Sequence, residues 1–161
     1  MKKCYKDLKI LGICAGQGAL LFPWRKQLLG NIEPRAVFHT QKEEQWRLNF
    51  GEIPFLRNEL PEKWHPDIIL SSPDCGASST MRLSKAKELG NPEKNKSIQL
   101  VIEGIMQYQP KVFMIENVPR LMNLMPEKIW QEALPNYNIS FKVNSVMDFG
   151  NSQVSRKRLI I

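Results

Sequence analysis

Short apolar runs of strand length alternate with helix-like stretches along this chain, and this alternation most constrains its fold. The runs that predict strands are Leu8 to Cys14, Arg35 to His39, Asp67 to Ser71, Val112 to Glu116, Ile139 to Val146 and Leu159 to Ile161. The stretches that predict helices are Ala19 to Leu29, Glu43 to Asn49, Ser97 to Tyr108 and Pro126 to Leu134. Strands that alternate with helices indicate an α/β fold of Rossmann-like type. Its mostly parallel sheet would have helices on both faces and bind ligands where the strands end.

A polar loop and an amphipathic helix are predicted between the third and fourth strands. From Gly76 to Lys96, small polar residues alternate with lysines and arginines, and the apolar pattern breaks down. A loop of this length inside a compact domain is usually functional. The helix that follows carries an apolar stripe, made of Ile98, Val101, Ile102, Ile105 and Met106.

Length and composition favour one domain over residues 1–161, because 42% of the residues are hydrophobic and can form a sizeable core. The three cysteines form no CxxC pair and the two histidines lack ligand spacing, so neither a disulfide framework nor a metal site is expected. No apolar run approaches ~20 residues and the start is charged, which predicts an intracellular protein without a membrane segment. The formal net charge of +7 favours a polyanionic partner such as nucleic acid.

A cysteine and a glutamate each follow a predicted buried strand. Cys75 comes after the run from Asp67 to Ser71, beside Pro73, where a nucleophile would be displayed, and Glu116 ends the next run. Because parallel strands end at the same edge of a sheet, we expect the two side chains to lie side by side. A thiol and a carboxyl held together can attack a ring while protonating it. The alternatives are an inert loop cysteine and a structural glutamate that pairs with an arginine or caps a helix near Pro119.

Two further segments lie at predicted strand ends. The turn Ala15-Gly16-Gln17-Gly18 follows the first strand, where glycines let a nucleotide-like ligand approach the backbone, although a tight strand-to-helix turn has the same sequence. The basic triplet Arg156-Lys157-Arg158 precedes the last strand and either returns to the same sheet edge or forms a solvated patch. Cys14 ends an apolar run and is expected to be a small core residue.

These segments, in this order, make the chain resemble the DNA cytosine-5 methyltransferase family of the bacterial or phage type. The first motif of that family is similar to Ala15 to Gly18, and its catalytic loop to Pro73-Asp74-Cys75. Its ENV motif is similar to Glu116-Asn117-Val118, and its QxRxR motif to the segment from Gln153 to Arg158. The resemblance spans nearly the whole chain.

The resemblance implies methylation of DNA in a bacterial or phage-infected cytoplasm, as in restriction-modification, with S-adenosylmethionine as the cofactor. Cys75 would attack carbon 6 of a flipped-out cytosine, so that carbon 5 can accept the methyl group. Glu116 would protonate or hydrogen-bond ring nitrogen 3 during this attack. The residues implied for the substrate pocket are Pro73, Asn117 and Val118, those for the base carbonyl are Arg156 and Arg158, and those for the cofactor are Ala15, Gly16, Gln17 and Gly18. The polar loop would close over the base and the DNA backbone.

The chain departs from the family pattern at several positions. An acidic residue and an aromatic residue of the first motif are replaced by Gly12 and Cys14, and the next glycine by Ala19. The nucleophile is flanked by Asp74 and Gly76, where the family has proline and glutamine. The candidates for the ribose contact are His39, Thr40, Gln41, Glu43 and Glu44, and those for the adenine contact are Asn58 and Glu59.

The family also has a target-recognition domain and C-terminal motifs, which are absent from the 161 residues. Three explanations are compatible with this difference. The chain is a fragment of a longer enzyme, one part of a split enzyme whose second chain supplies target recognition, or a degenerate remnant. Two other functions remain open: a non-catalytic or partner-dependent nucleic-acid-binding subunit, and an unrelated nucleotide-binding enzyme that shares only the glycine turn. RNA is also open as the substrate in place of DNA.

Overall fold

The computed structural model describes residues 8–15, 18–21, 32–35, 41–51, 65–74, 95–150 and 156–161. The chain divides into two compact units. Unit 1 contains Met1–Ser72 and Glu103–Phe113, and unit 2 contains Pro73–Ile102 and Met114–Ile161. The division passes through helix α4 (Lys96–Tyr108) and strand β4 (Val112–Asn117), so each of these elements contributes residues to both units.

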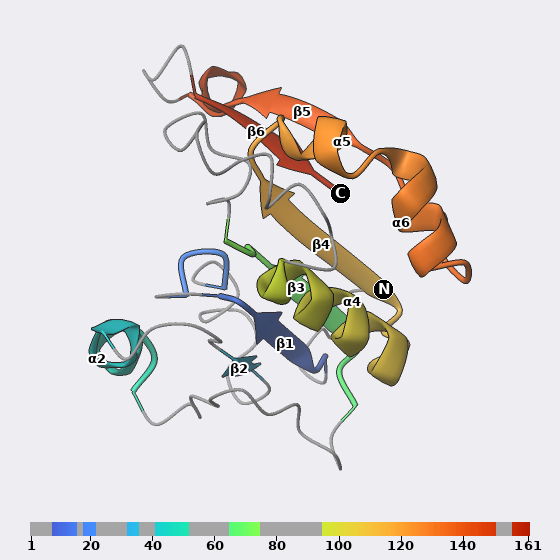
Figure 1. Cartoon of the computed structure of the whole chain (residues 1–161). Helices are drawn as coiled ribbons and strands as arrows, with labels where there is room; N and C mark the ends of the chain where they lie inside the picture. Colours follow the sequence, from blue (N-terminus) through green and yellow to red (C-terminus); the bar gives the residue numbers. More distant parts are fainter. Residues whose placement is uncertain are drawn as a thin grey trace, which may run out of the picture. The chain divides into compact units, whose positions relative to one another are not determined.

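Unit 1 contains three parallel strands, β1 (Ile10–Ile13), β2 (Ile32–Arg35) and β3 (Ile68–Ser71). They occur in the order β2-β1-β3 (Figure 1). Gly12 of β1 is in register with Pro34 on one side and Leu70 on the other. β1 lies between two strands, and all four of its residues are buried. The predicted strand at Arg35 to His39 shares only Arg35 with β2, and the residues after it lie outside the described part of the chain.

Helix α2 (Gln41–Phe50) confirms the helix predicted after the second strand. Its Trp46 and Phe50 rings stack with centroids 3.9 Å apart, and both are buried. Gly18 lies against these rings with a φ of +86°, and a Cβ atom there would come 2.1 Å from Phe50 Cε2 and 2.7 Å from Trp46 Cζ3. Gly18 therefore has a packing role of its own.

Replacing Gly18 with alanine is expected to lower the free energy of unfolding by about 2–5 kcal/mol. The left-handed backbone costs about 1–2 kcal/mol for a residue with a Cβ atom, and overpacking against the rings adds about 1–3 kcal/mol. Gly51→Ala is the matched control, because Gly51 has a φ of +60° and nothing within 4 Å of the added Cβ. Urea denaturation of both variants measures the difference. Equal losses would show that the aromatic contact adds no strain.

Asp67 joins the residues that precede β1, β3 and β4, all of which belong to unit 1. Its carboxylate accepts a hydrogen bond from the Lys9 backbone N–H at 3.0 Å and pairs with Lys111 Nζ at 2.6 Å. Its backbone carbonyl also accepts the Lys111 N–H at 2.9 Å. The hydrogen bond from the Lys111 side chain is the main cause that lowers the pKa of Asp67, and the Lys9 N–H lowers it further.

Unit 2 contains antiparallel strands. β6 (Lys157–Ile160) lies between β4 and β5 (Lys142–Ser145) and is antiparallel to both (Figure 1). Glu116 is in register with Ile160, and Ile115 and Ile161 exchange backbone hydrogen bonds of 2.9 and 3.0 Å. The α/β class is confirmed, and the sheet is mixed because β6 runs in the opposite direction to its neighbours.

Helix α4 begins at Lys96, which the sequence assigned to the preceding loop. The buried positions on its face are Ile98, Val101, Ile105 and Tyr108. Their spacing of three and four residues keeps them on one side of the helix. Met106 was wrongly included in the stripe: it is 55% exposed because it is rotated about 100° from Ile105.

The remaining described elements of unit 2 are α5 (Leu121–Leu124), α6 (Glu127–Ala133) and the 3₁₀ helix η4 (Val146–Phe149). α6 confirms the helix predicted from Pro126, and its Trp130 is fully buried. Residues 19–21 form a turn, and the rest of the helix predicted from Ala19 lies outside the described residues. Across the described ranges, no helix has the length and apolar character needed to cross a membrane.

Candidate active site

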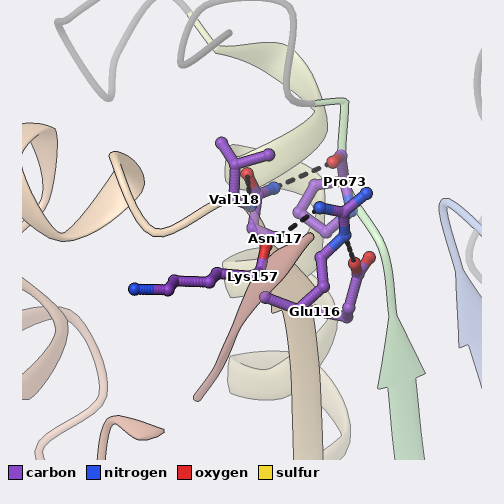
Figure 2. Close-up of polar contacts among 6 residues, drawn as sticks. Pro73, Glu116, Asn117, Val118 and Lys157 are labelled. Atoms are coloured by element: carbon purple, nitrogen blue, oxygen red, sulfur yellow. Dashed lines mark hydrogen bonds and ion pairs between the residues drawn. The ribbon is translucent and has the colours of Figure 1, made fainter. Parts of the chain in front are cut away.

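The end of β4 and the start of β6 form a polar site in unit 2. Because β6 is antiparallel to β4, its first residues lie at the edge where β4 ends. Glu116 and Arg158 are diagonal neighbours across the two strands, and Arg158 Nε lies 2.7 Å from Glu116 Oε1 (Figure 2). The Arg158 Nη1 also donates to the Lys157 carbonyl at 2.9 Å. The contacts with Glu116 and with the Lys157 carbonyl therefore orient the Arg158 guanidinium.

The Glu116 and Arg158 side chains are 25% and 30% exposed. The structure therefore brings together two of the residues predicted for catalysis and leaves both accessible to a ligand. Glu116 pairs with an arginine, which is one of the structural roles that the sequence left open. A charge-assisted contact of this length fixes the direction of a carboxyl group without covering it.

Asn117 connects the end of β4 to the segment after β3. Its Nδ2 donates to the Pro73 carbonyl at 3.0 Å, and its Oδ1 accepts the Val118 N–H at 2.9 Å (Figure 2). Asn117 is 3% exposed, and its hydrogen bond to the Pro73 carbonyl is buried. Of the three residues that the resemblance places in the substrate pocket, Asn117 thus contacts the other two.

Ser97 and Asn95 were missed by the sequence interpretation. Ser97 Oγ accepts the Asp74 N–H at 3.1 Å and donates to Asn95 Oδ1 at 2.8 Å. Asn95 Oδ1 also accepts the Ile98 N–H at 3.3 Å, which makes Asn95 the N-cap of α4. An asparagine directly before an apolar-periodic stretch is the sequence signal that could have identified this cap.

The other two residues of the basic triplet, Arg156 and Lys157, are more exposed than Arg158. Lys157 is exposed, and its side chain points away from Glu116 (Figure 2). Arg156 precedes β6 and is exposed, and the ion pair to Glu116 is made by Arg158. Of the two arginines predicted for the site, Arg158 is the one whose ion pair with Glu116 is described.

The predicted cofactor turn belongs to unit 1 and follows β1. Gly18 N–H donates to the Ala15 carbonyl at 2.9 Å, which closes a tight turn, and Ala15 is buried. Cys14 precedes it with a φ of +56° and is half-buried just after the strand, so it is not the core residue that was predicted. Ser71 Oγ donates to the Ile13 carbonyl at 2.7 Å and ties the end of β3 to the end of β1.

Several predicted site residues lie outside the described part of the chain. They are Cys75, Gly16, Gln17, Gln153, His39, Thr40, Asn58 and Glu59. Of the acids considered for the ribose contact, Glu44 is exposed on α2. Among the residues that the structure describes, no group of three or more histidine, cysteine, aspartate or glutamate side chains could hold a metal ion.

A family model described as "C-5 cytosine-specific DNA methylase" matches residues 30–161. The chain belongs to this family. Two curated methylase relatives are each 30% identical to it: the type II methyltransferase M.Bpa9945I of Bacillus paralicheniformis over 58% of the chain, and M.AplI of Arthrospira platensis over 60%. The chain spans 21% and 28% of the length of these relatives.

A solved structure confirms the methyltransferase fold of this methylase family member. A DNA modification methyltransferase encoded within an Escherichia coli prophage aligns with a TM-score of 0.71 at 18% identity, covering 96% of this chain and 45% of that one. At this identity the likeness concerns the fold. The family membership rests on the match over residues 30–161.

Proposed function

We propose that this chain carries catalytic residues of a DNA cytosine-5 methyltransferase, which transfers a methyl group from S-adenosylmethionine to carbon 5 of a flipped-out cytosine. The observation that carries the proposal is the ion pair of Glu116 and Arg158 beside the buried Asn117 at one sheet edge. The family membership and the type II methyltransferase names of the relatives support DNA as the substrate.

The turn after β1 fits a nucleotide-like cofactor. It is a tight turn at the carboxyl end of a buried strand with parallel neighbours on both sides, which is where such folds bind nucleotides. Ala15, Gly16, Gln17 and Gly18 would hold S-adenosylmethionine there. When bound, this cofactor supplies the electrophilic methyl group.

The chemistry on the base is assigned to the residues of this chain. The Cys75 thiolate forms a bond to carbon 6, and the electron pair of the C5–C6 double bond makes carbon 5 nucleophilic. Glu116 holds or delivers a proton at ring nitrogen 3, which stabilises the charge that this attack places on the ring. Arg158 fixes the direction of the Glu116 carboxyl group. After carbon 5 has bonded to the methyl group, its hydrogen leaves as a proton to water, and the electron pair of that C–H bond restores the double bond as the thiolate departs.

Release of tritium tests this function, because substitution at carbon 5 must displace the hydrogen bound there. The protein expressed from its complete reading frame is incubated with S-adenosylmethionine and DNA that carries tritium at carbon 5 of cytosine. Tritium should appear in water in equal amount to the methyl groups incorporated into DNA. A parallel reaction with RNA of the same sequence tests the polymer preference. Methyl incorporation without tritium release would place the reaction at another atom and contradict the proposal.

A further inference from the structure

One peptide bond in unit 2 is held at both of its polar groups by buried side chains. The carbonyl of Pro73 accepts from Asn117 Nδ2 at 3.0 Å, and the N–H of Asp74 donates to Ser97 Oγ at 3.1 Å. These two groups belong to the same peptide unit, which is planar. Asn117 and Ser97 come from β4 and α4, and each is 3% exposed. The plane of this peptide is therefore fixed from two elements.

Three hydrogen bonds at this peptide form a chain in which each donor points in the same direction. The Asn117 amide donates to the Pro73 carbonyl, the Asp74 N–H donates to Ser97, and the Ser97 hydroxyl donates to Asn95 Oδ1 at 2.8 Å. Bonds in such a chain polarise and strengthen one another. Both Asn117 and Asn95 are themselves fixed, by the Val118 N–H and the Ile98 N–H. The peptide is thus held by a connected network.

We propose that Ser97 and Asn117 are positioning residues for Cys75, and that they act by clamping the Pro73–Asp74 peptide. This inference rests on the proposed function, in which Cys75 is the nucleophile. Cys75 is bonded to Asp74 in the sequence, so fixing the Pro73–Asp74 peptide restrains the backbone from which Cys75 extends. Misplacement of a reacting group by about 1 Å can lower a rate about 100-fold.

The clamp itself is tested without reference to catalysis by hydrogen exchange at the Asp74 amide, followed by NMR. Ser97→Ala removes the acceptor and should accelerate this exchange about 5- to 10-fold, the effect of losing one buried hydrogen bond. Ser97→Thr retains a hydroxyl group and should restore slow exchange. Gln131→Ala is the matched control for Asn117→Ala, because Gln131 Nε2 donates to the Tyr137 carbonyl at 2.8 Å on the exposed surface.

The consequence for Cys75 is tested by the rate of covalent capture of DNA that contains 5-fluorocytosine, with the protein expressed from its complete reading frame. Ser97→Ala and Asn117→Ala should slow capture about 10- to 100-fold at saturating DNA, with DNA affinity unchanged and the pH profile retained. Ser97→Thr should recover the rate, and Gln131→Ala should capture normally. Because the clamp acts on position, a shifted pH profile or a loss confined to DNA affinity would contradict it.

The two proposals fail in different ways. If the unaltered protein captures DNA and both clamp variants capture it at the same rate, the positioning role is wrong and the proposed function stands. If the unaltered protein forms no covalent complex, the role of Cys75 as nucleophile is wrong, and the positioning role falls with it. Rapid Asp74 exchange in the unaltered protein would also overturn the clamp.

Discussion

Substitution of Cys75 by serine is expected to abolish covalent capture of DNA containing 5-fluorocytosine. Attack at carbon 6 needs a thiolate, and a serine hydroxyl is a far weaker nucleophile without an activating base. Fluorine at carbon 5 cannot leave as a proton does, so the normal reaction stops with the protein attached to the base. The complex is measured as a band that survives denaturing electrophoresis.

Cys14→Ser is the control for this substitution. Cys14 lies after β1 in unit 1 with a φ of +56°, so its replacement can alter stability while leaving the proposed nucleophile intact. Capture should therefore persist in this variant at a temperature where it is folded. Capture that survives in Cys75→Ser would assign the nucleophile to another residue.

Replacement of Glu116 by glutamine is expected to slow single-turnover methylation by about 100- to 10,000-fold, the range typical of general acid catalysis. The amide occupies the same space as the carboxyl group and its oxygen can still accept from Arg158, but it cannot deliver a proton. The expected change in melting temperature is small, because the ion pair is partly exposed and such pairs contribute little. Rapid-quench methylation and thermal denaturation measure the two effects separately.

Glu132→Gln is the matched control, since Glu132 forms an exposed ion pair with Lys128 at 3.8 Å within α6. It changes the same carboxyl to the same amide in unit 2, away from Glu116, and should leave methylation unaltered. Near-normal turnover in Glu116→Gln would reassign Glu116 to a structural role. A large fall in melting temperature with proportionate loss of turnover would do the same.

The elements with strong local patterns could be predicted from the sequence. β3, β4 and α4 are each predicted to within one residue at either end, because apolar runs and one amphipathic stripe define them. The burial predicted for the β4 run was wrong, since Val112 is exposed and Phe113 and Met114 are half-buried. The sequence did not place β2 correctly because β2 contains Pro34. Proline has no backbone N–H to donate to a neighbouring strand, so its presence argues against a strand. Among the described strands β2 pairs only with β1, and a strand with one partner tolerates proline.

The part of the candidate site that depends on where strands end could be predicted from the sequence. Glu116 lies near the end of β4 and Arg158 near the start of the antiparallel strand β6, so their meeting at one edge follows from the fold. The hydrogen bonds of Ser97 to Asp74 and of Asn117 to Pro73 join residues 23 and 44 positions apart, which no local pattern encodes. Gly18 was assigned to the cofactor from its sequence, whereas its contact with Trp46 and Phe50 required the packing of α2 to be known.

The insertion of β6 between β4 and β5 also affects how this chain can misfold. Among the described strands, β5 pairs with β6 alone, so β5 has no place in the sheet until β6 has formed. Until then, β4 and β5 each present an unpaired edge that can recruit strands from other chains. Because β6 follows both strands in the sequence, these edges exist during synthesis before their partner has emerged from the ribosome. Aggregation during expression is therefore expected to respond strongly to substitutions in Lys157–Ile160 that delay strand pairing.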